Sequence, residues 1–181
     1  MAKLISKTYG DALFTLAVEE GKVDSLLEEI EQLQEILRKN QDFDRLMEHP
    51  KINKEEKLSV AETVFKGRIS DELLGFLTII ISKDRYQDMD EILSYFIGEV
   101  KKYKGIGIAT VTTAVPLKDE QCKKIEQKLL DTTQYKSMEM HYQTDASLIG
   151  GMVIRIGDRV VDSSISTKLN ELQRELLQVQ I

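Results

Sequence analysis

The chain has 181 residues, of which 41% are hydrophobic and 31% are charged, a balance typical of a folded protein with one large or two small domains. Its formal net charge is -6 at pH 7, which opposes binding to nucleic-acid phosphates and to anionic lipid head groups. We therefore expect protein partners and no nucleic-acid partner.

Cys122 is the single cysteine, so an internal disulfide is excluded, and this composition agrees with a reducing compartment. The longest apolar run, Leu73 to Ile81, is interrupted by Gly75 and Thr78 and is shorter than the roughly 20 residues that span a bilayer. The N-terminus lacks the apolar region and cleavage site of a secretory signal. Any membrane association is therefore expected to be indirect, without insertion.

From Leu4 to Tyr103, apolar residues recur at helical spacing, and the pattern breaks at cap and turn residues. Asn53 and Glu56 have the spacing of a capping box at the start of one helix. The predicted helices run from about residue 4 to Gly21, from Val23 to Asn40, through Phe43 and Met47 to His49-Pro50, from Asn53 to Gly67, from Ser70 to Ser82, and from Tyr86 to Lys104. Their short connections predict an antiparallel six-helix bundle over residues 1–105.

The fifth predicted helix is apolar on nearly every side. Its apolar residues are Leu73, Leu74, Phe76, Leu77, Ile79, Ile80 and Ile81. A helix tolerates such a pattern when neighbouring elements surround it. We therefore expect this helix to lie at the centre of the bundle.

Gly10 lies in the middle of the first predicted helix, directly after Tyr9. A glycine there costs about 1 kcal/mol relative to alanine unless something needs the space. The close approach of a partner helix is one such reason, and random drift is the other. The sequence favours neither.

After Gly105 the apolar period changes from helical spacing to two, which indicates strands. Strands are predicted over Ile106–Val115 and around Met138, Met140 and Tyr142, with a helix from Asp119 to Leu130 between them. Residues 106–181 are therefore predicted to form a small α/β domain, in the order strand, helix, strand, hairpin, helix. The predicted fold class of the whole chain is α+β.

The last part of the chain combines a hairpin and a helix. Met152, Ile154 and Ile156 alternate as in a strand, Gly157-Asp158 predicts a two-residue turn, and Gly150-Gly151 suits a bulge or a close backbone approach. Ser163 or Ser164 is the expected N-cap of the final helix. Its apolar residues, spaced by four and three, are Ile165, Leu169, Leu172, Leu176 and Val179. This stripe either packs on the chain's own sheet or meets a partner helix as a short coiled-coil strip.

The sequence contains no pattern typical of a catalytic or cofactor site. His49 and His141 fall in different predicted domains without a second ligand at metal spacing, so neither predicts a zinc site. Cys122 lies on the apolar stripe of its helix, which favours a small buried side chain, and a cysteine-dependent hydrolase would require a histidine nearby. Gly105 and Gly107 follow a helix and open a strand, the reverse of a phosphate-binding loop. We therefore predict no catalytic residues, no metal and no cofactor.

The segment Asp145 to Leu172 closely resembles the C-terminal motif of the delta subunit of bacterial F-type ATP synthases, which is called the oligomycin-sensitivity-conferring protein (OSCP) in mitochondria. The run from Tyr9 to Phe14 resembles the N-terminal Tyr-Ala-x-Ala-Leu-Phe pattern of that family. The run from Leu73 through Ile81 to Tyr86 resembles its fifth helix and following turn. The resemblance covers essentially the whole chain, and its specific part is LIGGMVIRIGDRVVD.

This resemblance implies a non-catalytic stator that joins the catalytic head of the rotary synthase to the peripheral stalk, on the cytoplasmic face of a bacterial membrane. It implies that the N-terminal bundle binds an amphipathic helix from the N-terminus of an alpha subunit between its first and fifth helices, where Tyr9, Leu13, Ile79 and Ile80 are the candidate residues. It also implies that the C-terminal domain binds b-type stalk subunits, with Leu169, Leu172 and Leu176 as candidates. The alternative is a helical adaptor unrelated to ATP synthesis.

Overall fold

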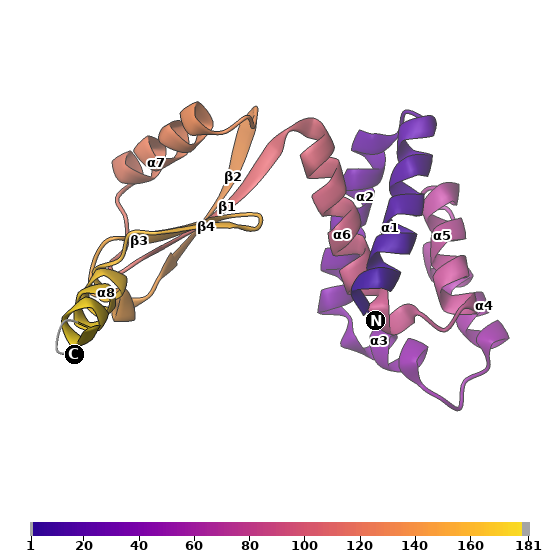
Figure 1. Cartoon of the computed structure of the whole chain (residues 1–181). Coiled ribbons are helices and arrows are strands. Elements are labelled where there is room, and N and C mark those ends of the chain that lie inside the picture. The colour runs from indigo at the N-terminus through magenta and orange to yellow at the C-terminus, as the bar shows by residue number, and fades with distance from the viewer. Residues whose placement is uncertain (1, 179–181) are drawn as a thin grey trace. The chain divides into compact units, whose positions relative to one another are not determined.

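The computed structural model describes residues 2–178, which form an α+β fold with eight α-helices and one four-stranded mixed sheet (Figure 1). The chain divides into two compact units, a helical unit that extends to Val100 and a C-terminal unit that begins at Lys101. The division falls inside the last helix of the first unit, a few residues before the predicted domain boundary at 105.

The helical unit matches the predicted element order. Its helices are α1 (Ala2–Glu19), α2 (Val23–Lys39), α3 (Gln41–Glu48), α4 (Lys54–Phe65), α5 (Asp71–Ser82) and α6 (Met89–Lys104), and a short 3-10 helix, η1 (Tyr86–Asp88), precedes α6. Gly21 and Gly67 follow α1 and α4 with φ of 66° and 74°, a left-handed conformation that stops a helix at low cost. The predicted positions of these helix ends are confirmed.

One apolar core joins these helices. Its fully buried side chains include Leu33, Ile80, Ile92, Leu93 and Phe96, all with 2% or less of their surface exposed. In α2 the buried leucines and isoleucine recur every three or four residues, as the amphipathic pattern predicts. Burial of these stripes, at about 25 cal/mol per Å² of apolar surface, is what holds the helices together.

Two predictions for the helical unit were wrong in detail. The side chain of Asn53 precedes α4 as expected but forms no capping hydrogen bond to any described residue, so the predicted capping box is not formed. Helix α5 is not enclosed, because Ile79 is 51% exposed and Gly75 is also exposed. One face of α5 is therefore open, although Leu73, Leu77 and Ile80 are buried.

The C-terminal unit is a sheet with strand order β2-β1-β3-β4 and two helices. Its elements are β1 (Ile106–Thr113), α7 (Asp119–Thr132), β2 (Ser137–Thr144), the 3-10 helix η2 (Ala146–Leu148), β3 (Met152–Ile156), β4 (Arg159–Asp162) and α8 (Ile165–Gln178). Strands β1 and β2 are parallel and are connected through α7, whereas β3 is antiparallel to both β1 and β4. Ile156 pairs with Arg159, which confirms the two-residue Gly157-Asp158 turn.

Helix α7 covers one face of this sheet. The hydroxyl of Tyr142 in β2 donates to the carbonyl of Cys122 in α7 at 3.2 Å, which places α7 on the face to which Ala109 and Val111 point. The register of β3 places Ile154 and Ile156 on the same face, where they are only half-buried. Among the described residues of this unit, the buried apolar side chains are Ala109, Val111 and Met138, so its core is small.

Candidate partner-binding surfaces

Helices α1 and α5 run antiparallel as neighbours in the helical unit (Figure 1). Lys22, which follows α1, forms an ion pair with Glu72 in the first turn of α5. At the other end, α1 contacts η1, which follows α5. The bond to Glu72, together with Glu20, raises the pKa of Lys22, and Lys22 in turn lowers the pKa of Glu72. The two helices are therefore tied together at both ends.

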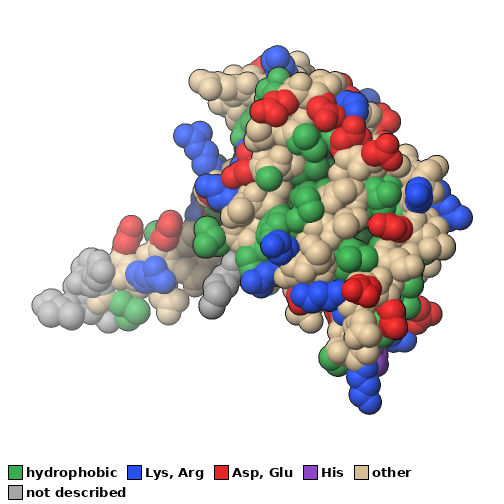
Figure 2. Space-filling view, turned by 90° about the vertical axis from the view of Figure 1, so that its right-hand side faces the viewer, with side chains coloured by type: hydrophobic (Ala, Val, Ile, Leu, Met, Phe, Trp, Pro, Cys, Tyr) green, Lys and Arg blue, Asp and Glu red, His purple; other side chains and the backbone are tan. Residues whose placement is uncertain are grey.

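The outward face of this helix pair is partly apolar. Figure 2 shows hydrophobic side chains gathered across the middle of the face that α5 presents, between acidic and basic side chains. Ile79 of α5 is 51% exposed, and Tyr9 of α1 is half-buried against the core. Leu13 and Ile80 lie inside the core instead, with 2% and 0% of their surfaces exposed.

Helix geometry explains why the four predicted residues do not share one surface. Ile79 and Ile80 are consecutive and point about 100° apart, so the exposed position of Ile79 directs Ile80 inward. Tyr9 and Leu13 lie one turn apart, and Leu13 is the member that reaches the core. The prediction that these residues bind a partner stays a prediction. In this structure Tyr9 and Ile79 are accessible, whereas Leu13 and Ile80 hold the two helices in place.

The structure explains Gly10 from within the chain. A Cβ atom added at Gly10 would lie 2.4 Å from Cδ1 of Tyr95 in α6, so only a glycine leaves room for this ring. The Tyr95 hydroxyl donates to Oδ1 of Asp11 at 2.9 Å, and partial burial together with this bond raises the pKa of Tyr95 to about 12. The close approach at Gly10 is therefore made by α6, not by a partner helix.

The apolar stripe of α8 is open. Leu169, Leu172 and Leu176 are 52%, 55% and 69% exposed, and Leu177 beside them is 59% exposed. These leucines and Gln173 line a shallow apolar hollow on one side of the helix. Of the two alternatives for this stripe, packing on the chain's own sheet is wrong for Leu169, Leu172 and Leu176. Val179, which continues the predicted stripe, lies outside the described residues.

A second apolar region lies on the sheet. Beyond the end of α7, residues of α7, β3 and β4 line an open hollow of about 720 Å³, and its apolar lining includes Leu129, Ile154, Ile156 and Val161. Because α7 packs mainly on β2, the β3–β4 half of this face is left without a helix above it. The C-terminal unit therefore exposes apolar surface on both the sheet and α8.

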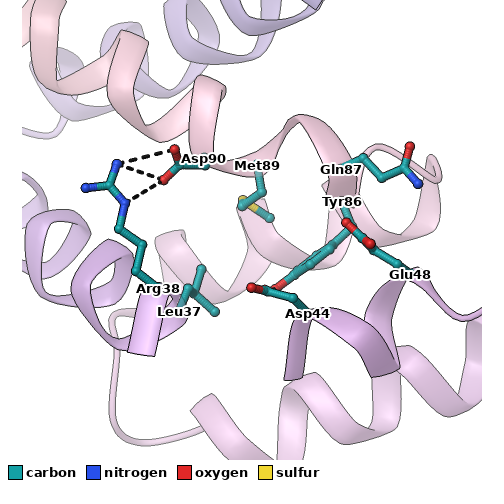
Figure 3. A pocket seen from close by; sticks show the side chains of 8 residues that line it. All are labelled: Leu37, Arg38, Asp44, Glu48, Tyr86, Gln87, Met89 and Asp90. Atoms are coloured by element: carbon teal, nitrogen blue, oxygen red, sulfur yellow. Dashed lines mark hydrogen bonds and ion pairs between the residues drawn. The ribbon is translucent and has the colours of Figure 1, made fainter. Parts of the chain in front are cut away.

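Of the eight side chains that line the hollow in Figure 3, four polar ones bind one another in two pairs. Arg38 of α2 forms an ion pair with Asp90 of α6 at 3.1 Å, and the Tyr86 hydroxyl donates to Oδ1 of Asp44 in α3 at 2.6 Å. Burial of the Tyr86 ring, assisted by Asp44, raises the pKa of the phenol. These bonds connect α2 and α3 to η1 and α6, so these four side chains serve the packing of the helices.

Cys122 and His141, the residues considered for catalysis, do not form a catalytic pair. Cys122 is partly buried in α7, and His141 lies on the solvent side of β2, where its Nε2 is 3.1 Å from Glu139. The register places Tyr142, not His141, on the face of the sheet that α7 covers. Across residues 2–178, no three His, Cys, Asp or Glu side chains are grouped as metal ligands would be.

Comparisons with known proteins agree on one family. The sequence profile described as ATP synthase delta (OSCP) subunit matches residues 5–176. The chain is 49% identical over 181 residues to "ATP synthase subunit delta" of Lachnoclostridium phytofermentans, with 100% of both chains covered. It is 31% identical to the protein of the same name from Alkaliphilus metalliredigens, with 99% of both chains covered. Its fold matches a chain of the Toxoplasma gondii mitochondrial ATP synthase hexamer with a TM-score of 0.75 at 20% identity, covering 95% of this chain and 97% of that one.

The chain therefore belongs to the ATP synthase delta (OSCP) subunit family. Within this family it is a non-catalytic stator subunit, a structural part of the F-type ATP synthase complex. The alternative of an adaptor unrelated to ATP synthesis is not supported. Over the described residues, none of the helices has the length and apolar character needed to cross a membrane.

Proposed function

We propose that the two units grip two different partners of the synthase. The helical unit, a six-helix antiparallel bundle, binds the amphipathic N-terminal helix of an alpha subunit along α1 and α5, with Tyr9 and Ile79 in contact with it. The C-terminal unit binds the b-type subunits of the peripheral stalk through Leu169, Leu172 and Leu176. The chain then lies peripherally at the cytoplasmic face of a bacterial membrane and resists the torque of the rotor.

The exposed stripe of α8 is the observation on which the stalk contact rests. Three leucines one turn apart, each more than half exposed, leave apolar surface in water that a partner helix would cover. Full burial of a leucine side chain contributes about 1.5–3 kcal/mol. Three such side chains, already partly buried, supply a substantial part of a stable contact before ordering costs are subtracted.

The open face of α5 supports the alpha-subunit contact. Ile79 is exposed beside Gly75, and an exposed glycine lets another backbone approach closely. Tyr9 lies on α1, the antiparallel neighbour of α5, and is only half-buried. A helix laid between α1 and α5 would contact both side chains with one apolar stripe.

Calorimetry with the full chain tests the two contacts separately. The first titrant is a peptide of the alpha-subunit N-terminal helix, and the second is the soluble C-terminal part of the b-type subunits. We expect Ile79→Asp and Tyr9→Asp each to lower the affinity for the alpha-subunit peptide about a hundredfold, because an unpaired carboxylate would be buried in the contact. We expect Leu172→Asp to lower the affinity for the stalk fragment by a similar factor and to leave the affinity for the alpha-subunit peptide unchanged.

The chain offers a matched control for each variant. Ile36 on α2 is 52% exposed, so Ile36→Asp places the same charge at an equally exposed isoleucine away from α1 and α5. Val160 on β4 is 51% exposed and serves in the same way for Leu172. If Ile79→Asp and Ile36→Asp bind the alpha-subunit peptide with equal affinity, α5 is not part of the proposed alpha site. If Leu172→Asp and Val160→Asp bind the stalk fragment with equal affinity, α8 is not part of the proposed stalk site.

A further inference from the structure

Helix α8 is attached to the sheet through a small set of backbone and side-chain bonds at its first turn. We call this set, made by residues 150–152 and 162–167, the joint. The main contact of α8 with another element is with η2, and beyond the joint the helix exposes Leu169, Leu172 and Leu176. The direction in which the leucine stripe projects is therefore decided at the joint.

Asp162, the last residue of β4, is the centre of the side-chain bonds. Its Oδ1 accepts from the backbone N–H of Ser164 at 2.8 Å, and its Oδ2 accepts from the hydroxyl of Thr167 at 2.7 Å. The hydroxyl of Ser164, which is completely buried, accepts from the backbone N–H of Thr167 at 3.2 Å and caps the helix. Two side chains thus connect the end of a strand to the first turn of the helix that follows.

The backbone bonds come from the start of β3. The N–H of Ile165 donates to the carbonyl of Gly150 at 2.9 Å, and the N–H of Ser163 donates to the carbonyl of Met152 at 2.9 Å. The hydroxyl of Ser163 donates to the same Met152 carbonyl, also at 2.9 Å. The first residue of α8 is therefore bonded directly to the segment that leads into the central part of the sheet.

Gly150 and Gly151 allow this close approach. Gly151 has a φ of 77°, and a Cβ atom there would lie 2.3 Å from the carbonyl oxygen of Ser163. A Cβ atom on Gly150 would lie 2.6 Å from Cδ1 of Ile165, which packs onto that backbone. A side chain at Gly151 would therefore displace the backbone of Ser163 and Ser164 just before α8, whereas one at Gly150 would require the end of the Ile165 side chain to move.

We propose that the joint aims α8, with Asp162 and Gly151 as positioning residues that present the leucine stripe to its partner in one fixed direction. The inference rests on the proposed stalk contact for its use, but the rigidity of the joint is a property of the free chain. A helix already aimed in its bound direction loses less conformational freedom when the partner binds. A rigid attachment would also transmit force from α8 to the sheet without a change in the angle between them.

Distances between two spin labels in the free, full-length chain test directly whether α8 has one fixed orientation relative to the sheet. Cys122 is replaced by serine, and nitroxides are placed on Arg155 of β3 and Glu171 of α8, both exposed and both outside the leucine stripe. We expect one narrow distance distribution in this background. Asp162→Ala and Gly151→Ala are expected to broaden or displace the distribution by several Å, while circular dichroism shows that α8 keeps its helical content.

Two matched variants control for indirect effects. Gly157→Ala also removes a glycine with positive φ, 54°, but the added Cβ would meet open space among the described residues, so the hairpin is strained without touching the joint. Asp158→Ala removes a carboxylate from the same hairpin. Both should keep the narrow distribution. An unchanged distribution in both Asp162→Ala and Gly151→Ala would overturn the proposal, and Gly151→Ala decides the case if loss of the Asp162 bonds unfolds α8.

Binding of the b-type stalk fragment provides the second measurement. We expect Asp162→Ala and Gly151→Ala to weaken it about tenfold although every leucine of the stripe is intact. A variant that broadens the distance distribution and binds with unchanged affinity would show that the aim of α8 has no role in the contact. If the unmodified chain does not bind the fragment, the proposed stalk function fails, whereas the distance measurement still decides whether the joint is rigid.

Discussion

The helical unit and the C-terminal unit bury apolar side chains to different degrees. Among the described residues of the helical unit, twenty buried apolar side chains form one cluster, and they come from each of the α-helices α1 to α6. The C-terminal unit has Ala109, Val111 and Met138 in the corresponding class among its described residues, while α7 and α8 contribute none that is fully buried. Two regions of similar length therefore reach very different core sizes.

This contrast indicates which unit would gain more stability from a bound partner. The helical unit closes its own core and offers a partner only a limited open face around Ile79. The C-terminal unit leaves apolar surface uncovered on α8 and beside β3 and β4, which a partner would complete. A small unit with few buried side chains has little stability of its own, so binding and stability are coupled there by mass action.

The largest effect is expected from removing a ring at the centre of the helical core. Phe96 is fully buried, and Phe96→Ala should lower the free energy of unfolding of the helical unit by about 3–5 kcal/mol through lost burial and the cavity that remains. Leu172→Ala on α8 should change stability by about 0.5 kcal/mol or less. Urea denaturation of the free chain measures both. A loss of 2 kcal/mol or more in Leu172→Ala would show that the leucine stripe is core after all.

Smaller changes in stability, opposite in sign, are expected when two glycines of the helical unit are replaced by alanine. Gly10→Ala should destabilise by about 1–3 kcal/mol, because the new methyl group meets the Tyr95 ring at 2.4 Å. Gly98→Ala in α6 meets open space among the described residues and should stabilise by up to about 1 kcal/mol through better helix propensity. Thermal unfolding of the two variants compares them directly, and a stabilised Gly10→Ala would disprove the close packing of α1 on α6.

A third, smaller effect concerns the pH dependence of the C-terminal unit. The bond from Lys101 to Glu139, 2.5 Å long, lowers the pKa of that carboxyl group below its ordinary value of 4.5. As pH falls, the Glu139 carboxylate is therefore protonated at a higher pH in the unfolded chain than in the folded one. The pair stabilises the unit above about pH 4.5, and this contribution is lost as pH decreases through the lowered pKa.

Glu139→Gln should accordingly destabilise the unit at pH 7, by about 1 kcal/mol or less, because the Glu139 carboxylate is still partly exposed to water. The difference from the unmodified chain should shrink towards zero near pH 3. Amide signals of β1 and β2, followed by nuclear magnetic resonance in urea, report on this unit alone. A difference that persists at acidic pH would mean that the ion pair is not its cause.

Local sequence patterns predicted most of the secondary structure. The turn at Gly157-Asp158, the cap at Ser164 and the helix end at Gly67 were correct because each depends on the backbone preferences of a few adjacent residues. The 3-10 turn over Tyr86–Asp88 and the unused cap at Asn53 were missed, because both depend on packing that local spacing does not record.

The surfaces were harder to predict than the elements. An apolar residue reads the same in sequence whether it faces the core, as Ile80 does, or solvent, as Ile79 does. The leucines of α8 illustrate the same limit, since their spacing fits both a buried and an exposed stripe. Gly10 signalled a close approach, but only the fold identified Tyr95 as the neighbour.

The strand order β2-β1-β3-β4 has a consequence for how the chain is made. The helices of the first unit are neighbours in sequence and can pack as they leave the ribosome. Strand β1 occupies the middle of the sheet, and its partner β3 is synthesised only after α7 and β2, so Val111 cannot meet Ile154 until late in translation. We expect nascent chains to display a finished helical unit before the C-terminal unit exists, which would set the order in which the two proposed partners can be recruited.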